Sequence, residues 1–207
     1  MVYIPVEDLM KIREYIVRDN EVCGYFFYNE SNLQEIKIIK VSDGPNILKT
    51  GRGSCDYGIW GNKRCIWHTH PMISKVYPSD EDIVKVLLNS NINISIIFSL
   101  WGIWEITTDL DYKYPSFFNK EEQLKYKKKC IDLLAPFSKK LYYDLDQSKK
   151  SGQKYRSLCG NLDNYLISID EYIKSIIKLF NIKITFTRWN KKIYNIKFDK
   201  ICDTKRK

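Results

Sequence analysis

The two histidines of the chain, His68 and His70, are separated by one residue, and the sequence contains no others. They follow the apolar run Cys65-Ile66-Trp67, which is typical of a buried β-strand. Side chains two positions apart on a strand point to the same face, so both imidazoles can be directed at one point. A catalytic zinc ion takes three protein ligands and leaves one position open. The pair therefore predicts a divalent metal site whose third ligand is an Asp, Glu or Cys from elsewhere.

A candidate for that ligand follows closely, at the predicted start of a helix. Ser79-Asp80-Glu81-Asp82 precedes an apolar helical pattern, and Asp82 is the preferred ligand. These residues also have an ordinary structural interpretation, because serine is a favoured helix N-cap and an acidic residue three positions later completes a capping-box-like turn. That interpretation explains Ser79 and Asp82, but it does not explain two histidines on one strand face beside them.

These motifs resemble the signature of the JAMM/MPN+ metalloproteases. The match consists of the His-x-His-Pro segment at residues 68–71, followed by Ser79-x-x-Asp82. Upstream, Glu21-Val22-Cys23-Gly24 is similar to the Glu-x-Cys-Gly motif of the deubiquitinating members. The resemblance covers roughly residues 5–110. It implies an α+β fold, similar to cytidine deaminases, in which helices flank a mixed sheet.

The resemblance also implies an activity and a role for each matched residue. His68, His70 and Asp82 would hold zinc, Glu21 would act as general base and then acid, and Ser79 would stabilise the oxyanion. The implied reaction is hydrolysis of the bond between lysine and ubiquitin or a ubiquitin-like protein, so such conjugates are the expected partners. From the residues alone, Glu21 is more simply a surface glutamate that follows a helix.

The spacing departs from the family pattern at one point. Residues 71–81 separate His70 from Asp82, which is one residue more than the family usually has. Either the loop carries an insertion or Glu81 is the third ligand. Adjacent residues on a helix project about 100° apart, whereas residues three apart return to nearly the same side. Because Ser79 and Asp82 are three apart, we expect Asp82 to face the site and Glu81 to point elsewhere.

Hydropathy patterns predict the remaining elements and a division near residue 110. Residues 1–110 are expected to form the metalloprotease-like domain, and 111–207 a basic, mainly helical C-terminal region. Pro136 is expected to kink or split the first C-terminal helix. The expected helices are 6–19, 79–89, 119–148 and 162–180. The expected strands are 21–28, 35–41, 63–68, 93–100 and 103–108, followed by a terminal hairpin of 182–186 and 193–198. Residues 43–64 are expected to be a glycine-bearing loop that shapes substrate access.

Charge divides along the same line. Residues 1–107 carry 11 basic and 13 acidic side chains, whereas residues 108–207 carry 23 basic and 12 acidic ones. The simplest interpretation is that solvated helix faces and a tail account for the basic surplus. The alternative is a docking surface for an acidic protein partner or nucleic acid. No nucleic-acid-binding motif supports the latter, so a nucleic-acid partner is not expected.

Cysteine usage and hydropathy bear on location. The six cysteines contain no CxxC pair, and we expect them to be reduced. From the opening residues we expect no secretory signal peptide, and the longest apolar stretch, about residues 94–104, is too short for a membrane span of about 20 residues. These features predict an intracellular, cytoplasmic protein without a membrane span.

Three functional hypotheses follow. The first is a zinc-dependent isopeptidase of the deubiquitinase type. The second is a catalytically silent scaffold or binding module of the same fold, which is less favoured because such members usually lack several of the matched residues. The third is a nucleic-acid-associated member of the fold, supported only by the basic C-terminal half.

Overall fold

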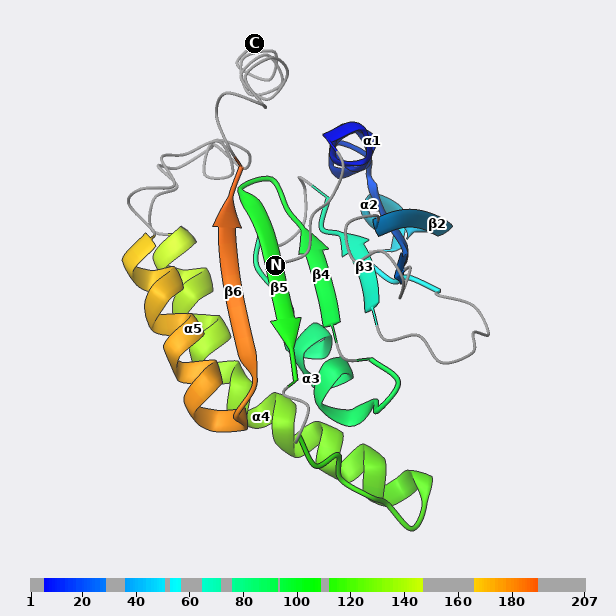
Figure 1. Ribbon diagram of the computed structural model, residues 1–207. Helices are drawn as coiled ribbons and strands as arrows, with labels where there is room; N and C mark the ends of the chain where they lie inside the picture. Colours follow the sequence, from blue (N-terminus) through cyan, green and yellow to red (C-terminus); the bar gives the residue numbers. More distant parts are fainter. Residues whose placement is uncertain are drawn as a thin grey trace.

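A six-stranded sheet lies at the centre of the computed structural model, with helices on both faces (Figure 1). The structure describes residues 6–28, 36–50, 53–56, 65–71, 76–92, 94–108, 112–146 and 166–189. Its elements are α1 (Val6–Ile16), β1 (Asn20–Tyr28), β2 (Ile36–Asn46), α2 (Ile47–Thr50), β3 (Cys65–Thr69), α3 (Asp80–Leu88), β4 (Ile94–Phe98), β5 (Gly102–Thr107), α4 (Lys120–Asp146), α5 (Leu166–Phe180) and β6 (Lys183–Arg188).

The strand order is β2-β1-β3-β4-β5-β6. All neighbouring pairs are antiparallel except β3 and β4, which are parallel and joined through α3. A parallel pair needs a crossover connection, and a helix commonly supplies it. The predicted α+β class with a mixed sheet and flanking helices is therefore confirmed.

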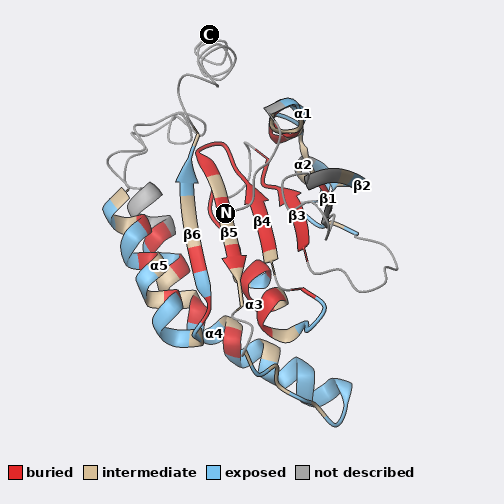
Figure 2. Ribbon diagram, viewed as in Figure 1, coloured by how far each residue is buried: buried red, intermediate tan, exposed pale blue. Residues whose placement is uncertain are grey.

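Strand β3 is buried along its whole length because helices cover both faces of the sheet here (Figure 2). Cys65 and Trp67 contribute to a cluster with Ile12 and Ile16 of α1. Ile66 points the other way, into a larger cluster formed with residues of α3, α4 and α5. The alternation of side chains along a strand therefore places His68 on the α3 side of the sheet.

The region between β1 and β3 differs from the prediction. Strand β2 was expected to end at residue 41, with a loop from residue 43, but it continues to Asn46 and leads into the short α2. Its pairing with β1 extends through register shifts to the pair Asn20 and Asn46. β2 is an edge strand of the sheet, where Pro45 is tolerated because one side of the strand needs no ladder partner. The rest of the expected loop is described only at residues 53–56 and 65 onward.

Helix α4 runs without interruption through Pro136, so the expected split is wrong. Proline at this position removes a hydrogen bond to the carbonyl of Asp132, four residues earlier. Both residues lie on the exposed face, where water can satisfy that carbonyl, while Leu134 and Leu141 anchor the opposite face in the core. No helix in the described part of the chain has the length and apolar composition that crossing a membrane requires.

Segments on both sides of residue 110 contribute to the same sheet and the same core. β6 pairs with β5, and Leu134, Ile176 and Ile184 are buried in the cluster that includes α3. Residues 109–111, where the division was predicted, lie outside the described ranges. β6 and α5 agree with the predicted strand 182–186 and helix 162–180 over the residues described. The second strand of the expected terminal hairpin lies outside the described residues.

Candidate metal centre

The two histidines converge at the end of β3. Their side chains are almost fully buried, and the Nε2 atoms are 3.1 Å apart. The backbone N–H of His70 donates to the carbonyl of Phe98 at the end of β4, so the strand pair continues to hold the chain here. The predicted convergence of the two imidazoles is therefore present in the structure.

The carboxylate of Asp82 completes the cluster from the first turn of α3. One oxygen lies 3.2 Å from Nε2 of His68, and the other lies 3.2 Å from Nε2 of His70. All three side chains are buried. Among the described residues, His68, His70 and Asp82 form a group that could hold a metal ion, because each offers a ligand atom close to the other two. The crossover β3–α3–β4 thus brings a strand end and a helix start together, as predicted for Asp82.

The ligand atoms of the three side chains lie within 4.8 Å of one another, so they are close enough to share one metal ion. Zinc bonds to nitrogen and oxygen of about 2.0–2.1 Å place neighbouring tetrahedral ligand atoms roughly 3.3–3.4 Å apart. The Nε2 atoms of the histidines are 3.1 Å apart, close to that value, and each lies 3.2 Å from a different oxygen of Asp82. For the three residues to form one face of a tetrahedron, a single Asp82 oxygen would have to approach both imidazoles, and the fourth position would be left to another ligand.

The electrostatics of the cluster favour an ionised carboxylate. Burial alone would raise the pKa of Asp82, because it disfavours the charged form. Attraction to His68 and hydrogen bonds with both imidazoles outweigh burial, so the pKa of Asp82 lies well below its usual value. Asp82 is therefore a carboxylate, which is the form that binds a metal.

Ser79 and Asp82 also form a capping box, so the structural interpretation and the metal interpretation hold together. Ser79 is the N-cap, and the backbone N–H of Asp82 donates to its hydroxyl oxygen at 3.2 Å. In return, the Asp82 carboxylate accepts from the backbone N–H of Ser79 at 2.7 Å and from its hydroxyl at 2.6 Å. These bonds fix the rotamer of Asp82 before any metal is bound.

Glu81, the alternative ligand, points away from the histidines. Its carboxylate is exposed and forms an ion pair of 2.7 Å with Lys127 of α4. Ser79 and Asp82 therefore share one side of the helix, as predicted, and Glu81 lies on another.

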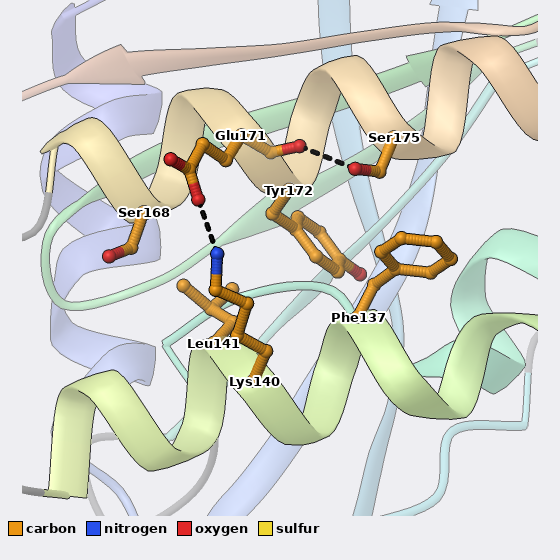
Figure 3. A pocket seen from close by; sticks show the side chains of 7 residues that line it. All are labelled: Phe137, Lys140, Leu141, Ser168, Glu171, Tyr172 and Ser175. Atoms are coloured by element: carbon orange, nitrogen blue, oxygen red, sulfur yellow. Dashed lines mark hydrogen bonds and ion pairs between the residues drawn. The ribbon is translucent and has the colours of Figure 1, made fainter.

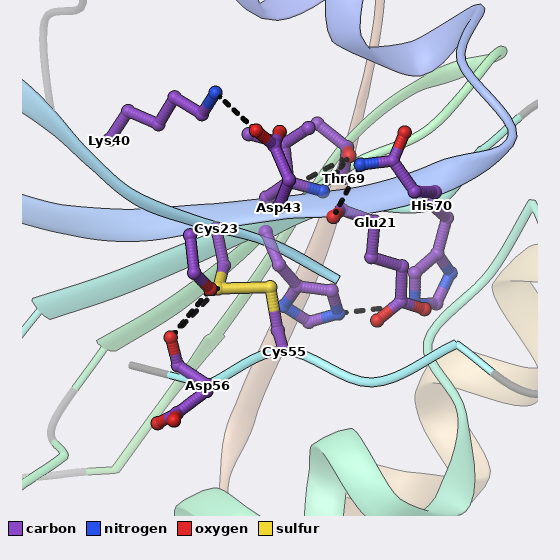
Figure 4. Close-up of a disulfide and its surroundings, with 12 residues drawn as sticks. Glu21, Cys23, Lys40, Asp43, Cys55, Asp56, Thr69 and His70 are labelled. Carbon is purple, nitrogen blue, oxygen red and sulfur yellow. Dashed lines mark hydrogen bonds and ion pairs between the residues drawn. A yellow bond between two sulfur atoms is a disulfide. The ribbon is translucent and has the colours of Figure 1, made fainter. Parts of the chain in front are cut away.

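Glu21 lies on the strand next to the histidines. β1 is antiparallel to β3 with Cys23 opposite His68, and the N–H of Val22 donates to the hydroxyl of Thr69 at 2.9 Å. Continuing this register places Glu21 beside His70, on the same sheet face as both imidazoles. Figure 4 shows the Glu21 side chain extending alongside the His70 ring. The side chain is half-buried, which leaves it access to solvent.

The segment of residues 53–56 lies against Glu21, a contact that the sequence did not predict. The backbone of Gly53 passes so close to Glu21 that a Cβ added at Gly53 would lie 2.1 Å from Oε1. A disulfide between Cys23 and Cys55 holds this segment to β1, with Cα atoms 6.0 Å apart (Figure 4). The Ser42 hydroxyl also donates to the carbonyl of Asp56, at 2.6 Å.

The expectation that the cysteines are reduced is therefore wrong for Cys23 and Cys55. The sequence contains no close cysteine pair, and these two stand 32 positions apart. They meet only because the chain returns from β2 across the face of β1. The one available signal was the expectation that the glycine-bearing loop lies beside the site.

No protein-family model, curated protein or solved structure matches the chain.

Proposed function

We propose that the chain is a zinc-dependent isopeptidase with the fold and active site of the JAMM/MPN+ metalloproteases. The observation that supports this most directly is the buried cluster of His68, His70 and Asp82, whose ligand atoms all lie within 4.8 Å of one another. A buried carboxylate between two imidazoles, with an additional carboxylate from Glu21 on the same sheet face, is more than a structural role requires. The donor set of two nitrogens and one oxygen suits zinc.

His68, His70 and Asp82 would hold the metal. When bound, zinc would supply a Lewis acid for a carbonyl oxygen and would lower the pKa of water. Glu21 would accept a proton from the attacking water and deliver it to the leaving amine. Its half-buried position beside His70 suits that transfer, since it faces the cluster without being one of its three members.

Ser79 would stabilise the oxyanion of the tetrahedral intermediate. Its hydroxyl lies beside the cluster, but it donates to Asp82. Oxyanion stabilisation therefore requires the hydroxyl to change its acceptor, while the backbone N–H of Ser79 keeps the carboxylate in place. A donor directed at the developing charge typically contributes about 10²–10³ in kcat.

The proposed substrate is an isopeptide between lysine and ubiquitin or a ubiquitin-like protein. This part of the proposal depends on the resemblance of the segment at residues 21–24 to the deubiquitinating members. A silent scaffold remains the second candidate, because the capping box gives Asp82 and Ser79 a role that needs no metal. The two candidates differ in zinc content and in hydrolysis, so one set of measurements separates them.

The test combines elemental analysis with a panel of ubiquitin chains, incubated with and without a chelator. We expect about one zinc per chain and hydrolysis that the chelator abolishes. The double variant His68→Ala/His70→Ala should contain no zinc, because a single remaining ligand cannot hold it. Glu21→Ala should keep the zinc and lose hydrolysis, because it removes a proton carrier rather than a metal ligand.

Two results would contradict the proposal. Full zinc content in the double histidine variant would mean that the metal binds elsewhere. A wild-type chain that contains no zinc and hydrolyses no ubiquitin chain would support the scaffold instead.

A further inference from the structure

The start of α3 has two sides. Ser79 and Asp82 face the histidine cluster, as described above. Their neighbours in the sequence, Pro78, Asp80 and Glu81, contact the C-terminal helices α4 and α5. The first turn of α3, which carries the proposed ligand Asp82, is therefore also bonded on its other side to α4 and α5, by residues more than 40 positions later in the chain.

Two of these contacts are buried hydroxyl hydrogen bonds. The hydroxyl of Ser138 in α4 donates to the carboxylate of Asp80, and the hydroxyl of Tyr172 in α5 donates to the carbonyl of Pro78 at 3.4 Å. Ser138 is 8% exposed and Tyr172 is 3% exposed. The third contact, the ion pair of Lys127, lies at the surface, where such pairs contribute little.

Tyr172 is well placed to act as a fixed donor. Burial raises the pKa of its phenol far above the usual value, so the hydroxyl stays protonated. Its ring makes edge contacts with Tyr77 and Trp104, which come from the segment before α3 and from β5. Figure 3 shows Tyr172 reaching from α5 toward α4, between Leu141 and Phe137. Trp104 adds a hydrogen bond of 2.9 Å to the carbonyl of Val76 in the same segment.

The arrangement matters because the cluster is shared between two elements. His68 and His70 are held by the sheet, whereas Asp82 moves with α3. The capping box fixes Asp82 relative to its own helix. It does not fix the helix relative to β3. The buried apolar face of α3 packs in the core with Ile66, and the contacts of residues 78–80 hold the start of the helix, where Asp82 lies.

We propose that Ser138 and Tyr172 are positioning residues for the metal centre, and that they set the distance between Asp82 and the two histidines by anchoring the start of α3. The inference rests on the zinc site proposed above. It assigns the C-terminal helices a part in that site, since Ser138 and Tyr172 bond to Asp80 and Pro78 at the start of α3. Groups that orient ligands from outside the coordination sphere typically change metal affinity about 10–100-fold when removed.

The test measures zinc affinity of the full chain by competition with a chromophoric chelator, at a temperature at which every variant is folded. Ser138→Ala and Tyr172→Phe should each bind zinc about 10-fold more weakly. Ser138→Thr keeps a hydroxyl and should restore most of the affinity. Ser175→Ala is the matched control, because the Ser175 hydroxyl bonds only within α5, to the carbonyl of Glu171, in the contacts described. It should leave the affinity unchanged.

Cobalt(II) in place of zinc adds a spectroscopic measurement that a general loss of stability would not alter. The visible bands of the cobalt protein should change in the Ser138→Ala and Tyr172→Phe variants and stay as in the wild type for Ser175→Ala. If Ser138→Ala does not fold, Tyr172→Phe decides, because it keeps the ring contacts. Wild-type affinity and spectrum in the folded variants would overturn the positioning role alone. A wild-type chain that binds no zinc would overturn the proposed function itself.

Discussion

Gly53→Ala should separate the function of Glu21 from the stability of the fold. The added Cβ would lie 2.1 Å from Oε1 of Glu21 and 2.5 Å from Cδ, whereas ordinary contact begins at 3.4 Å. The carboxylate must therefore move by about 1.3 Å, the difference between the contact limit and the 2.1 Å separation. Because the obstructing atoms are the end of a flexible side chain, the movement costs the fold little.

Both effects can be estimated. Gly53 does not have the positive φ that disfavours alanine, so the free energy of unfolding should change by less than about 1 kcal/mol. A displacement of about 1 Å of a catalytic group can cost about 100-fold in rate. We therefore expect Gly53→Ala to keep its zinc and its denaturant midpoint and to hydrolyse the substrate found in the chain panel about 100-fold more slowly.

The assay needs two controls. In a Glu21→Ala background, Gly53→Ala should have no further effect on the rate, because the group that it displaces is already missing. Gly44→Ala provides the contrast, since its Cβ would lie 2.0 Å from the backbone oxygen of Ser54, which cannot move freely, and the fold should be destabilised. Wild-type activity in Gly53→Ala, or an equal loss in the Glu21→Ala background, would refute the reasoning.

Three further predictions follow from the structure. Asp82→Asn should lose both zinc and activity while Glu81→Gln keeps both, because only Asp82 lies against the histidines. Elemental analysis and the panel of ubiquitin chains measure the two effects, and the reverse pattern would make Glu81 the third ligand. Reducing the disulfide between Cys23 and Cys55 should lower the free energy of unfolding by about 3.7 kcal/mol in urea melts, as the chain-entropy model gives for residues 32 positions apart. An unchanged melt in excess dithiol would contradict it. Pro136→Ala should raise the free energy of unfolding by about 1–3 kcal/mol, because it restores a helical N–H in α4; a decrease would mean that proline contributes contacts of its own.

The sequence predicted those features of the site that depend on local patterns. Strand alternation and helical spacing are local properties, so they placed His68 and His70 on one face and selected Asp82 over Glu81. The match of Glu21 to the strand beside them required the family resemblance, since a glutamate after a helix has no local mark of function. These placements agree with the structure, whereas the zinc and the reaction stay proposals.

Long-range contacts were beyond such reasoning. Cys23 and Cys55 meet through a chain return that no local pattern encodes, and Ser138 in α4 shows no sign in the sequence that it bonds to Asp80. Pro136 misled the prediction because its effect depends on which face of the helix is exposed, a property of tertiary packing. Each failure concerns a contact between segments distant in the chain.

Asp82 has two roles, since it caps α3 and contacts the two histidines, and this affects how metal binding in a relative should be inferred from its sequence. A descendant that gave up metal binding would still gain from keeping Ser79 and Asp82, because the pair caps α3 on its own. The two histidines have no comparable second role in a helix cap, so selection would release them first. In a catalytically inactive relative, the serine and aspartate would then persist as remnants of the site, and only the loss of His68 and His70 would record that the metal had gone.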